Sequence, residues 1–72
     1  MQIHYDAHSD LLYLRLDDKA QDVVNQRVSD NIVLDVGQGE RIVGIEILDA
    51  SKHLNLERLL PIEYHVAAKL TT

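Results

Sequence analysis

The stretch that decides the fold is Leu11-Leu12-Tyr13-Leu14-Arg15-Leu16, in which every second residue is a leucine. Successive side chains of a β-strand point to opposite faces of the sheet. The alternation therefore predicts a strand with three leucines on one face and Leu11, Tyr13 and Arg15 on the other. A strand with one apolar face needs partner strands, and the rest of the chain has to supply them.

Four further segments have strand character, and turn residues separate them. They span residues 2–5, 23–28, 32–36 and 41–48. The break at residues 6–10 is rich in Asp and Ser, which favour turns. In the break at residues 37–40, two glycines can supply the positive φ values of a hairpin loop. Short loops between consecutive strands predict an antiparallel meander of four or five strands.

The pattern changes from strand to helix after residue 48. Asp49 or Ser51 can cap a helix N-terminus, and the residues that follow are rich in helix formers, with leucines at helical spacing. We expect one helix over about residues 50–60, which Pro61 interrupts. The tail, residues 61–72, fits a strand through Ile62, Tyr64 and Val66, but its alanines favour a helix, which we prefer.

Together these segments predict one small α+β domain over residues 1–72, with the sheet over about 2–48 and the helix packed on one face. The covered face is expected to hold Leu12, Leu14, Leu16, Leu34, Val43, Ile45 and Ile47. The opposite face would hold Leu11, Tyr13, Val23, Val33, Ile42 and Leu48. That is more apolar area than a small monomer usually exposes, so we expect a homodimer that uses the second face or the tail.

Composition narrows the classes of protein. The 72 residues include 7 Lys plus Arg and 12 Asp plus Glu, a net charge of -5, and no Cys. An acidic chain argues against a nucleic-acid partner, and the lack of Cys excludes disulfides and thiolate metal sites. No apolar run is long enough for a membrane span, and the first residues do not resemble a signal peptide. The expected location is the cytoplasm.

The most chemical-looking segment is residues 4–10, which contains two imidazoles and two carboxylates. In an extended chain, the potential metal ligands His4, Asp6, His8 and Asp10 would lie on one side. The calcium-loop pattern and the helical His-Glu-x-x-His pattern are both absent. We therefore favour a simple turn with solvated histidines, and metal binding remains the alternative.

Glu46 is the second candidate, because it lies inside an otherwise apolar strand and needs a partner or water. A cross-strand ladder of charges would satisfy it, formed by Arg15, Arg27, Asp35 and Glu46. The same cluster with Tyr13 could instead bind a ligand or a partner. Gly44 interrupts this strand, which is best explained by packing of Tyr13 over it, with a ligand contact as the alternative. No nucleophile or phosphate-binding loop accompanies the carboxylates, so no catalytic residue and no cofactor are expected.

Four stretches together carry a resemblance to a known family. They are Tyr5-Asp6, Asp10 to Leu16, Ile32-Val33-Leu34-Asp35 and Ile42 to Ser51. In order and spacing the chain resembles, over about residues 1–54, the domain-of-unknown-function 2283 family of small bacterial and archaeal proteins. The resemblance implies a short sheet-plus-helix fold without an established activity. Because some members are encoded beside small toxin-like proteins, it also makes an antitoxin role conceivable.

These observations lead to two hypotheses for the function. The first is a non-enzymatic protein-interaction module, an acidic homodimer that binds a small protein partner. If that partner is a basic toxin, the homodimer would neutralise it by charge complementarity. The alternative is a metal- or small-molecule-binding protein that uses the segment His4, Asp6, His8 and Asp10.

Overall fold

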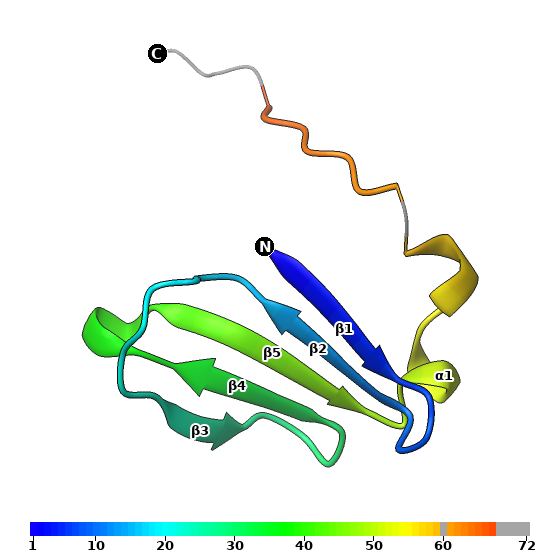
Figure 1. Cartoon of the computed structure of the whole chain (residues 1–72), viewed down its shortest axis with the longest axis horizontal. Coiled ribbons are helices and arrows are strands. Elements are labelled where there is room, and N and C mark those ends of the chain that lie inside the picture. Colours follow the sequence, from blue (N-terminus) through cyan, green and yellow to red (C-terminus); the bar gives the residue numbers. More distant parts are fainter. Residues whose placement is uncertain (60, 68–72) are drawn as a thin grey trace.

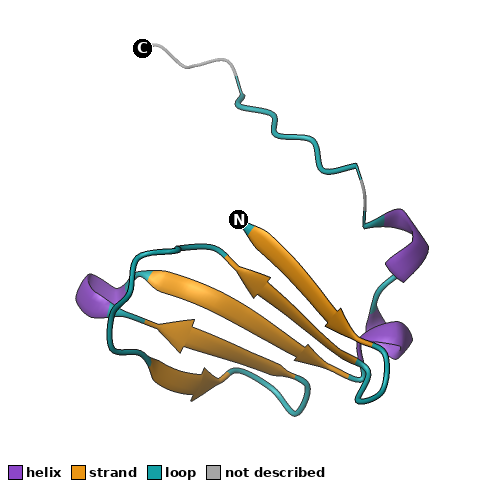
Figure 2. Ribbon diagram, viewed as in Figure 1, coloured by secondary structure: helices purple, strands orange, loops and turns teal. Residues whose placement is uncertain are grey.

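In a computed structural model of the chain, which describes residues 1–59 and 61–67, the predicted strands form one antiparallel sheet (Figure 1). The strands are β1 (Gln2–Asp6), β2 (Leu11–Arg15), β3 (Val24–Arg27), β4 (Ile32–Val36) and β5 (Ile42–Leu48). The helices are η1 (Gln38–Glu40), α1 (Ala50–His53) and η2 (Leu56–Arg58), all short (Figure 2). No helix of these residues has the length and apolar character needed to cross a membrane.

The order of the strands differs from the predicted meander. The sheet is ordered β1-β2-β5-β4-β3, so the chain leaves β2, crosses the end of the sheet and returns through β3 and β4 to lie beside β2. This is a Greek-key arrangement of the last four strands. It places β5, the longest strand, in the centre, where it pairs with both β2 and β4. Hydropathy patterns identify strands but do not state which strand is adjacent to which.

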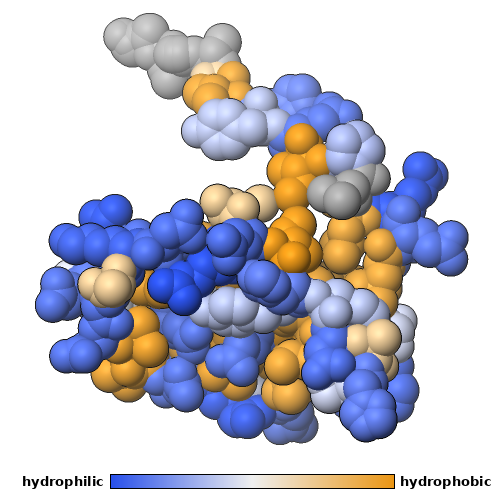
Figure 3. Space-filling view, viewed as in Figure 1, coloured by the Kyte–Doolittle hydropathy of each residue, from blue (hydrophilic) through white to orange (hydrophobic). Residues whose placement is uncertain are grey.

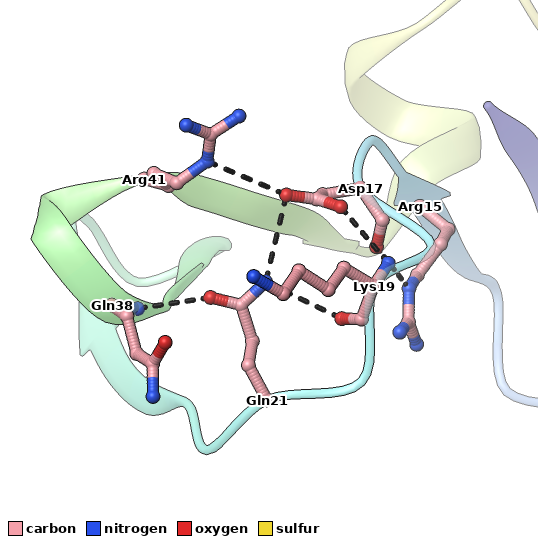
Figure 4. A network of polar contacts seen from close by, with 6 residues as sticks. All are labelled: Arg15, Asp17, Lys19, Gln21, Gln38 and Arg41. Carbon is pink, nitrogen blue, oxygen red and sulfur yellow. Dashed lines mark hydrogen bonds and ion pairs between the residues drawn. The ribbon is translucent and has the colours of Figure 1, made fainter.

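A network of polar contacts holds the crossing segment at the end of the sheet (Figure 4). The Asp17 carboxylate accepts a hydrogen bond from the backbone N–H of Lys19 (2.9 Å) and pairs with the Arg41 Nε atom (3.5 Å). The Gln21 amide donates to Asp17 and accepts from the backbone N–H of Gln38 (2.9 Å). Residues 17–21 are thereby tied to the loop between β4 and β5.

The glycines of that loop act differently from the prediction. Gly39 has a positive φ of 66°, but the second positive φ belongs to Glu40 (60°), whereas Gly37 is extended (φ -99°). Gly37 is constrained by space, because a Cβ atom there would collide with the Gln21 side chain and come within 2.7 Å of Val43. The close approach of the crossing segment therefore explains the glycine at position 37.

The pairing register divides the sheet into two unlike faces. The first, which we call the leucine face, consists of Ile3, Tyr5, Leu12, Leu14, Val24, Gln26, Ile32, Leu34, Val36, Ile42, Ile45 and Ile47. The second, the tyrosine face, consists of Gln2, His4, Asp6, Leu11, Tyr13, Arg15, Asn25, Arg27, Val33, Asp35, Gly44, Glu46 and Leu48. One placement was wrong: a register shift beside Val36 pairs it with Ile42, which moves Ile42 to the leucine face.

The predicted helix over residues 50–60 is the main error. α1 makes one turn, Leu54 is extended (φ -131°), and a single 3-10 turn follows at η2. One turn of helix gains few hydrogen bonds for the residues it orders, so it depends on contacts at its ends. Among the described residues, the extensive contacts between elements are all between neighbouring strands. The α+β prediction therefore holds for the sheet, but no long helix among residues 1–59 and 61–67 covers the leucine face.

The tail does not form the preferred helix within the described residues. Residues 61–67, which we call the arm, are extended and exposed, and they lead away from the sheet (Figure 1). Ile62, Tyr64 and Val66 are 50%, 89% and 74% exposed. The rest of the helix predicted for the tail, residues 68–72, lies outside the described part of the chain.

Candidate functional site

The segment that resembled a metal site, residues 4–10, consists of the end of β1 and the turn that follows it. β1 ends at Asp6, and the Asp6 Oδ1 atom accepts hydrogen bonds from the backbone N–H groups of His8 (2.9 Å) and Ser9 (3.4 Å). Hydrogen bonds from Ser9 and then from His8 lower the pKa of Asp6. The expected turn is confirmed, with Asp6 as the residue that closes it.

Asp10 closes a second contact, which the sequence did not reveal. It has a left-handed backbone (φ 55°), and its carboxylate accepts hydrogen bonds from the Tyr5 hydroxyl (2.6 Å), the Ser51 backbone N–H (3.0 Å) and the Ser51 hydroxyl (2.7 Å). The Tyr5 hydroxyl and then the Ser51 hydroxyl lower the pKa of Asp10. The cap of α1 therefore comes from the β1–β2 turn, and neither Asp49 nor Ser51 caps the helix with its own side chain.

These contacts separate the four metal-ligand candidates. His4 and Asp6 lie on the tyrosine face, the carboxylates of Asp6 and Asp10 are engaged, and the His4 ring contacts the Gln2 amide (3.1 Å). Within residues 1–59 and 61–67, no three His, Cys, Asp or Glu side chains are grouped as metal ligands. The one-sided arrangement required an extended chain, and the turn after Asp6 removes it.

A polar cluster at the centre of the tyrosine face is the strongest candidate site. Tyr13 donates a hydrogen bond from its hydroxyl to the Asp35 Oδ2 atom (3.0 Å), which lies two strands away. The bond passes over Gly44, where a Cβ atom would collide with the Tyr13 hydroxyl. The predicted packing of Tyr13 over Gly44 is therefore confirmed. Asp35 is only 8% exposed, and its Oδ1 atom has no hydrogen-bond partner in the described chain.

Glu46 completes this cluster with a second carboxyl group. Tyr13 and Val33 flank it in the register, so it lies diagonally beside Asp35 on the same face. Partial burial, followed by the negative charge of Asp35 beside it, raises the pKa of Glu46. Burial and then the hydrogen bond to Asp35 also raise the pKa of Tyr13. A protonated Glu46 can donate to Asp35, whereas two charged carboxylates repel each other.

The predicted ladder of charges is only partly present. Arg15, Arg27, Asp35 and Glu46 share the tyrosine face, as expected. The arginines, however, bind backbone oxygens: the Arg15 Nε atom donates to Asp17 (2.8 Å) and the Arg27 Nη1 atom to Asp30 (2.9 Å). Neither forms an ion pair with a carboxylate of the cluster in the part described, although the charge of Arg27 lowers the pKa of Glu46. The guanidinium groups therefore bind carbonyl oxygens just beyond the ends of their own strands.

A shallow hollow of about 280 Å³ lies elsewhere, lined by Ser51 and residues 54–57. It contains none of the residues of the cluster.

The cluster itself combines a hydroxyl, a buried carboxylate and a carboxyl group of raised pKa. Such a set can hold a proton or accept a hydrogen bond from a donor of a partner protein. The sequence indicated these residues through their shared face, but not the burial of Asp35 or its free oxygen.

Comparison with known proteins identifies the family of the chain. No curated protein and no solved structure matches the chain. The family model described as "Protein of unknown function (DUF2283)" matches residues 2–51, which span the whole sheet and the start of α1. The matched region includes Tyr13, Asp35, Gly44 and Glu46 as well as the Asp10–Ser51 contact. The chain therefore belongs to the DUF2283 family of proteins of unknown function.

Proposed function

We propose that this protein is a non-enzymatic interaction module that works as a homodimer joined through the leucine face. The sequence pattern favoured the opposite face, but the polar cluster of Tyr13, Asp35 and Glu46 lies at the centre of that face. The observation that supports the proposal is the exposure of the leucine face. Leu12 is 1% exposed, but its neighbours Leu14, Leu34, Ile45 and Ile47 are only half-buried, at the centre of the sheet. Strand residues of this type normally face a second layer, which the one-turn α1 does not provide.

Apolar side chains of the leucine face are open to solvent away from its centre as well. Val24, Ile32 and Ile42 are 71%, 37% and 47% exposed. Figure 3 shows apolar side chains reaching the surface between polar ones and at the base of the arm. A second copy on the leucine face would cover these side chains.

Charge favours a second copy as the occupant of the leucine face. The protein has a net charge of -5, yet no residue of the leucine face is charged. Two leucine faces can therefore approach without bringing like charges together. The tyrosine face and the loops carry the acidic residues, and they remain available for a basic protein partner, as an antitoxin-like role requires.

Light scattering coupled to size-exclusion chromatography tests this proposal. We expect a dimer of the full chain at micromolar concentration. Ile32→Lys places a charge on the leucine face at a position that is already 37% exposed, so it should give a folded monomer. Asn25→Lys, on the tyrosine face, is the matched control and should remain dimeric. A wild-type monomer, or a monomer caused by the control alone, would contradict the proposal.

A further inference from the structure

The arm has the pattern of a strand without a partner. Its apolar residues alternate with Glu63 and His65. The side chains of these two polar residues contact each other (2.9 Å), so they lie on one side of the extended segment. Ile62, Tyr64 and Val66 are at least half exposed on the other side. Within the described residues, no backbone hydrogen bond joins the arm to the sheet. Exposed apolar side chains in this alternation are typical of a strand that adds to another sheet.

β1 offers an open edge of the right length and pattern. It is an outer strand of the sheet, so one row of its backbone N–H and C=O groups has no neighbouring strand. It has five residues, and Ile3 and Tyr5 face the leucine side while Gln2, His4 and Asp6 face the other. The other edge, β3, has four residues, all exposed. β1 therefore matches residues 62–66 better.

We propose that the arm of one copy adds as an antiparallel strand to the β1 edge of a second copy, and that the two copies exchange arms. One register satisfies both sides of the arm. It places Ile62 opposite Tyr5 and Tyr64 opposite Ile3 of the second copy, which extends the leucine face. A shift by one residue would turn the apolar side chains to the polar face.

The same register matches the remaining residues. Val66 comes opposite Met1, which is 61% exposed, and Glu63 comes opposite His4. A carboxylate opposite an imidazole is a favourable cross-strand pair when the imidazole is protonated. Pro61, which has no N–H to donate, comes at the beginning of the added strand, where proline is tolerated.

A second copy is the occupant because each chain contains one arm and one open edge. Reciprocal exchange pairs both β1 edges and uses both arms, so the exchange is complete with two copies and gives a two-fold dimer. The arm of the same chain stands clear of its own β1 in Figure 1. This inference rests on the proposed dimer and adds the arm as its second point of contact.

The first test changes the arm in the full chain. The variant I62S/Y64S/V66S removes the apolar side, whereas E63Q/H65Q changes only the polar side and serves as the control. Sedimentation should show a dimer dissociation constant more than about a hundredfold above the wild-type value for the serine variant, and a nearly unchanged constant for the control. Because these residues are exposed, circular dichroism should show an unchanged sheet in both.

The second test locates the arm. The chain has no Cys, so a nitroxide attached to the His65→Cys variant labels a single position. The labelled variant is mixed with an equimolar amount of ¹⁵N-labelled wild-type chain. Broadening of the amide signals of β1 in the wild-type copy is expected, and a nitroxide on Asp30→Cys, in the turn at the other edge, should not cause it. In a second sample the nitroxide chain carries the ¹⁵N label and the wild-type chain does not. Broadening of β1 signals in that sample, with none in the labelled wild-type copy of the first, would overturn the exchange.

The outcomes separate this inference from the proposed function. If the serine variant dimerises as tightly as the wild type while Ile32→Lys is a monomer, the exchange is wrong and the leucine-face dimer stands. If the arm reaches β1 of the second copy but Ile32→Lys has no effect, the exchange stands without the leucine-face interface. A wild-type monomer at all concentrations would overturn both.

Discussion

Replacing Glu46 with glutamine should stabilise the protein at neutral pH. The Asp35 Oδ1 atom is buried without a donor, and Glu46 lies beside it with a raised pKa. Once Glu46 has lost its proton, it can only repel Asp35. A glutamine has the same shape, carries no charge and donates from its amide, so it supplies the missing hydrogen bond at every pH.

The magnitude follows from the cost of the free oxygen. An unsatisfied buried acceptor costs about 1–3 kcal/mol, and part of this cost is recovered when a donor reaches it. We expect E46Q to raise the free energy of unfolding by about 1–2 kcal/mol at pH 7. In a domain of this size, this corresponds to a rise in the melting temperature of roughly 4–16 °C.

The effect should depend on pH, with a definite sign. Because the pKa of Glu46 is raised from 4.5 in the folded protein, the native state binds this proton more tightly than the unfolded chain. Its contribution to stability is complete below pH 4.5 and is lost as the pH rises through the folded-state pKa. In acid, a protonated Glu46 is itself a donor, so E46Q and the wild type should there become similar.

Urea denaturation of both proteins at pH 4.5 and pH 7 measures this difference. Glu57→Gln, an exposed change on η2, is the control for the loss of one negative charge and should shift stability little at either pH. The reasoning would be refuted if E46Q were less stable than the wild type at pH 7. It would also be refuted if the advantage of E46Q were the same at both pH values.

Three other changes test the remaining contacts. Gly44→Ala should cost about 1–3 kcal/mol, because the new Cβ displaces the Tyr13 hydroxyl from Asp35, and the cost measured by urea denaturation should shrink in a Tyr13→Ala background. Asp10→Ala should lower the urea midpoint at neutral pH, because it removes the hydrogen bonds to Ser51. Since the pKa of Asp10 is lowered in the folded protein, the lost stability is the part that the wild type has above pH 3.8 and loses as the pH falls further. A midpoint equal to that of the wild type at neutral pH would contradict this. Gln21→Ala should speed hydrogen exchange at the Gln38 amide, which loses its acceptor, while exchange in β2 and β5 stays slow.

The sequence alone determined the strands and their faces. Alternation in residues 11–16, 32–36 and 41–48 depends only on the two-residue period of a strand, so it identified each segment and the side of most of its residues. It also assigned Tyr13, Arg15, Asp35 and Glu46 to one face, and it linked the glycine at position 44 to Tyr13. These are local properties, and local geometry is sufficient to specify them.

Only the tertiary structure decided how the strands are ordered and which polar atoms meet. The central position of β5, the register shift that moves Ile42 and the capping of α1 by Asp10 all join residues far apart in the chain. The one-turn length of α1 was also missed, because helix propensity in residues 50–60 does not show whether a long helix has a surface to pack on. The free oxygen of Asp35 likewise arises from burial between strands, which no pattern along the chain encodes.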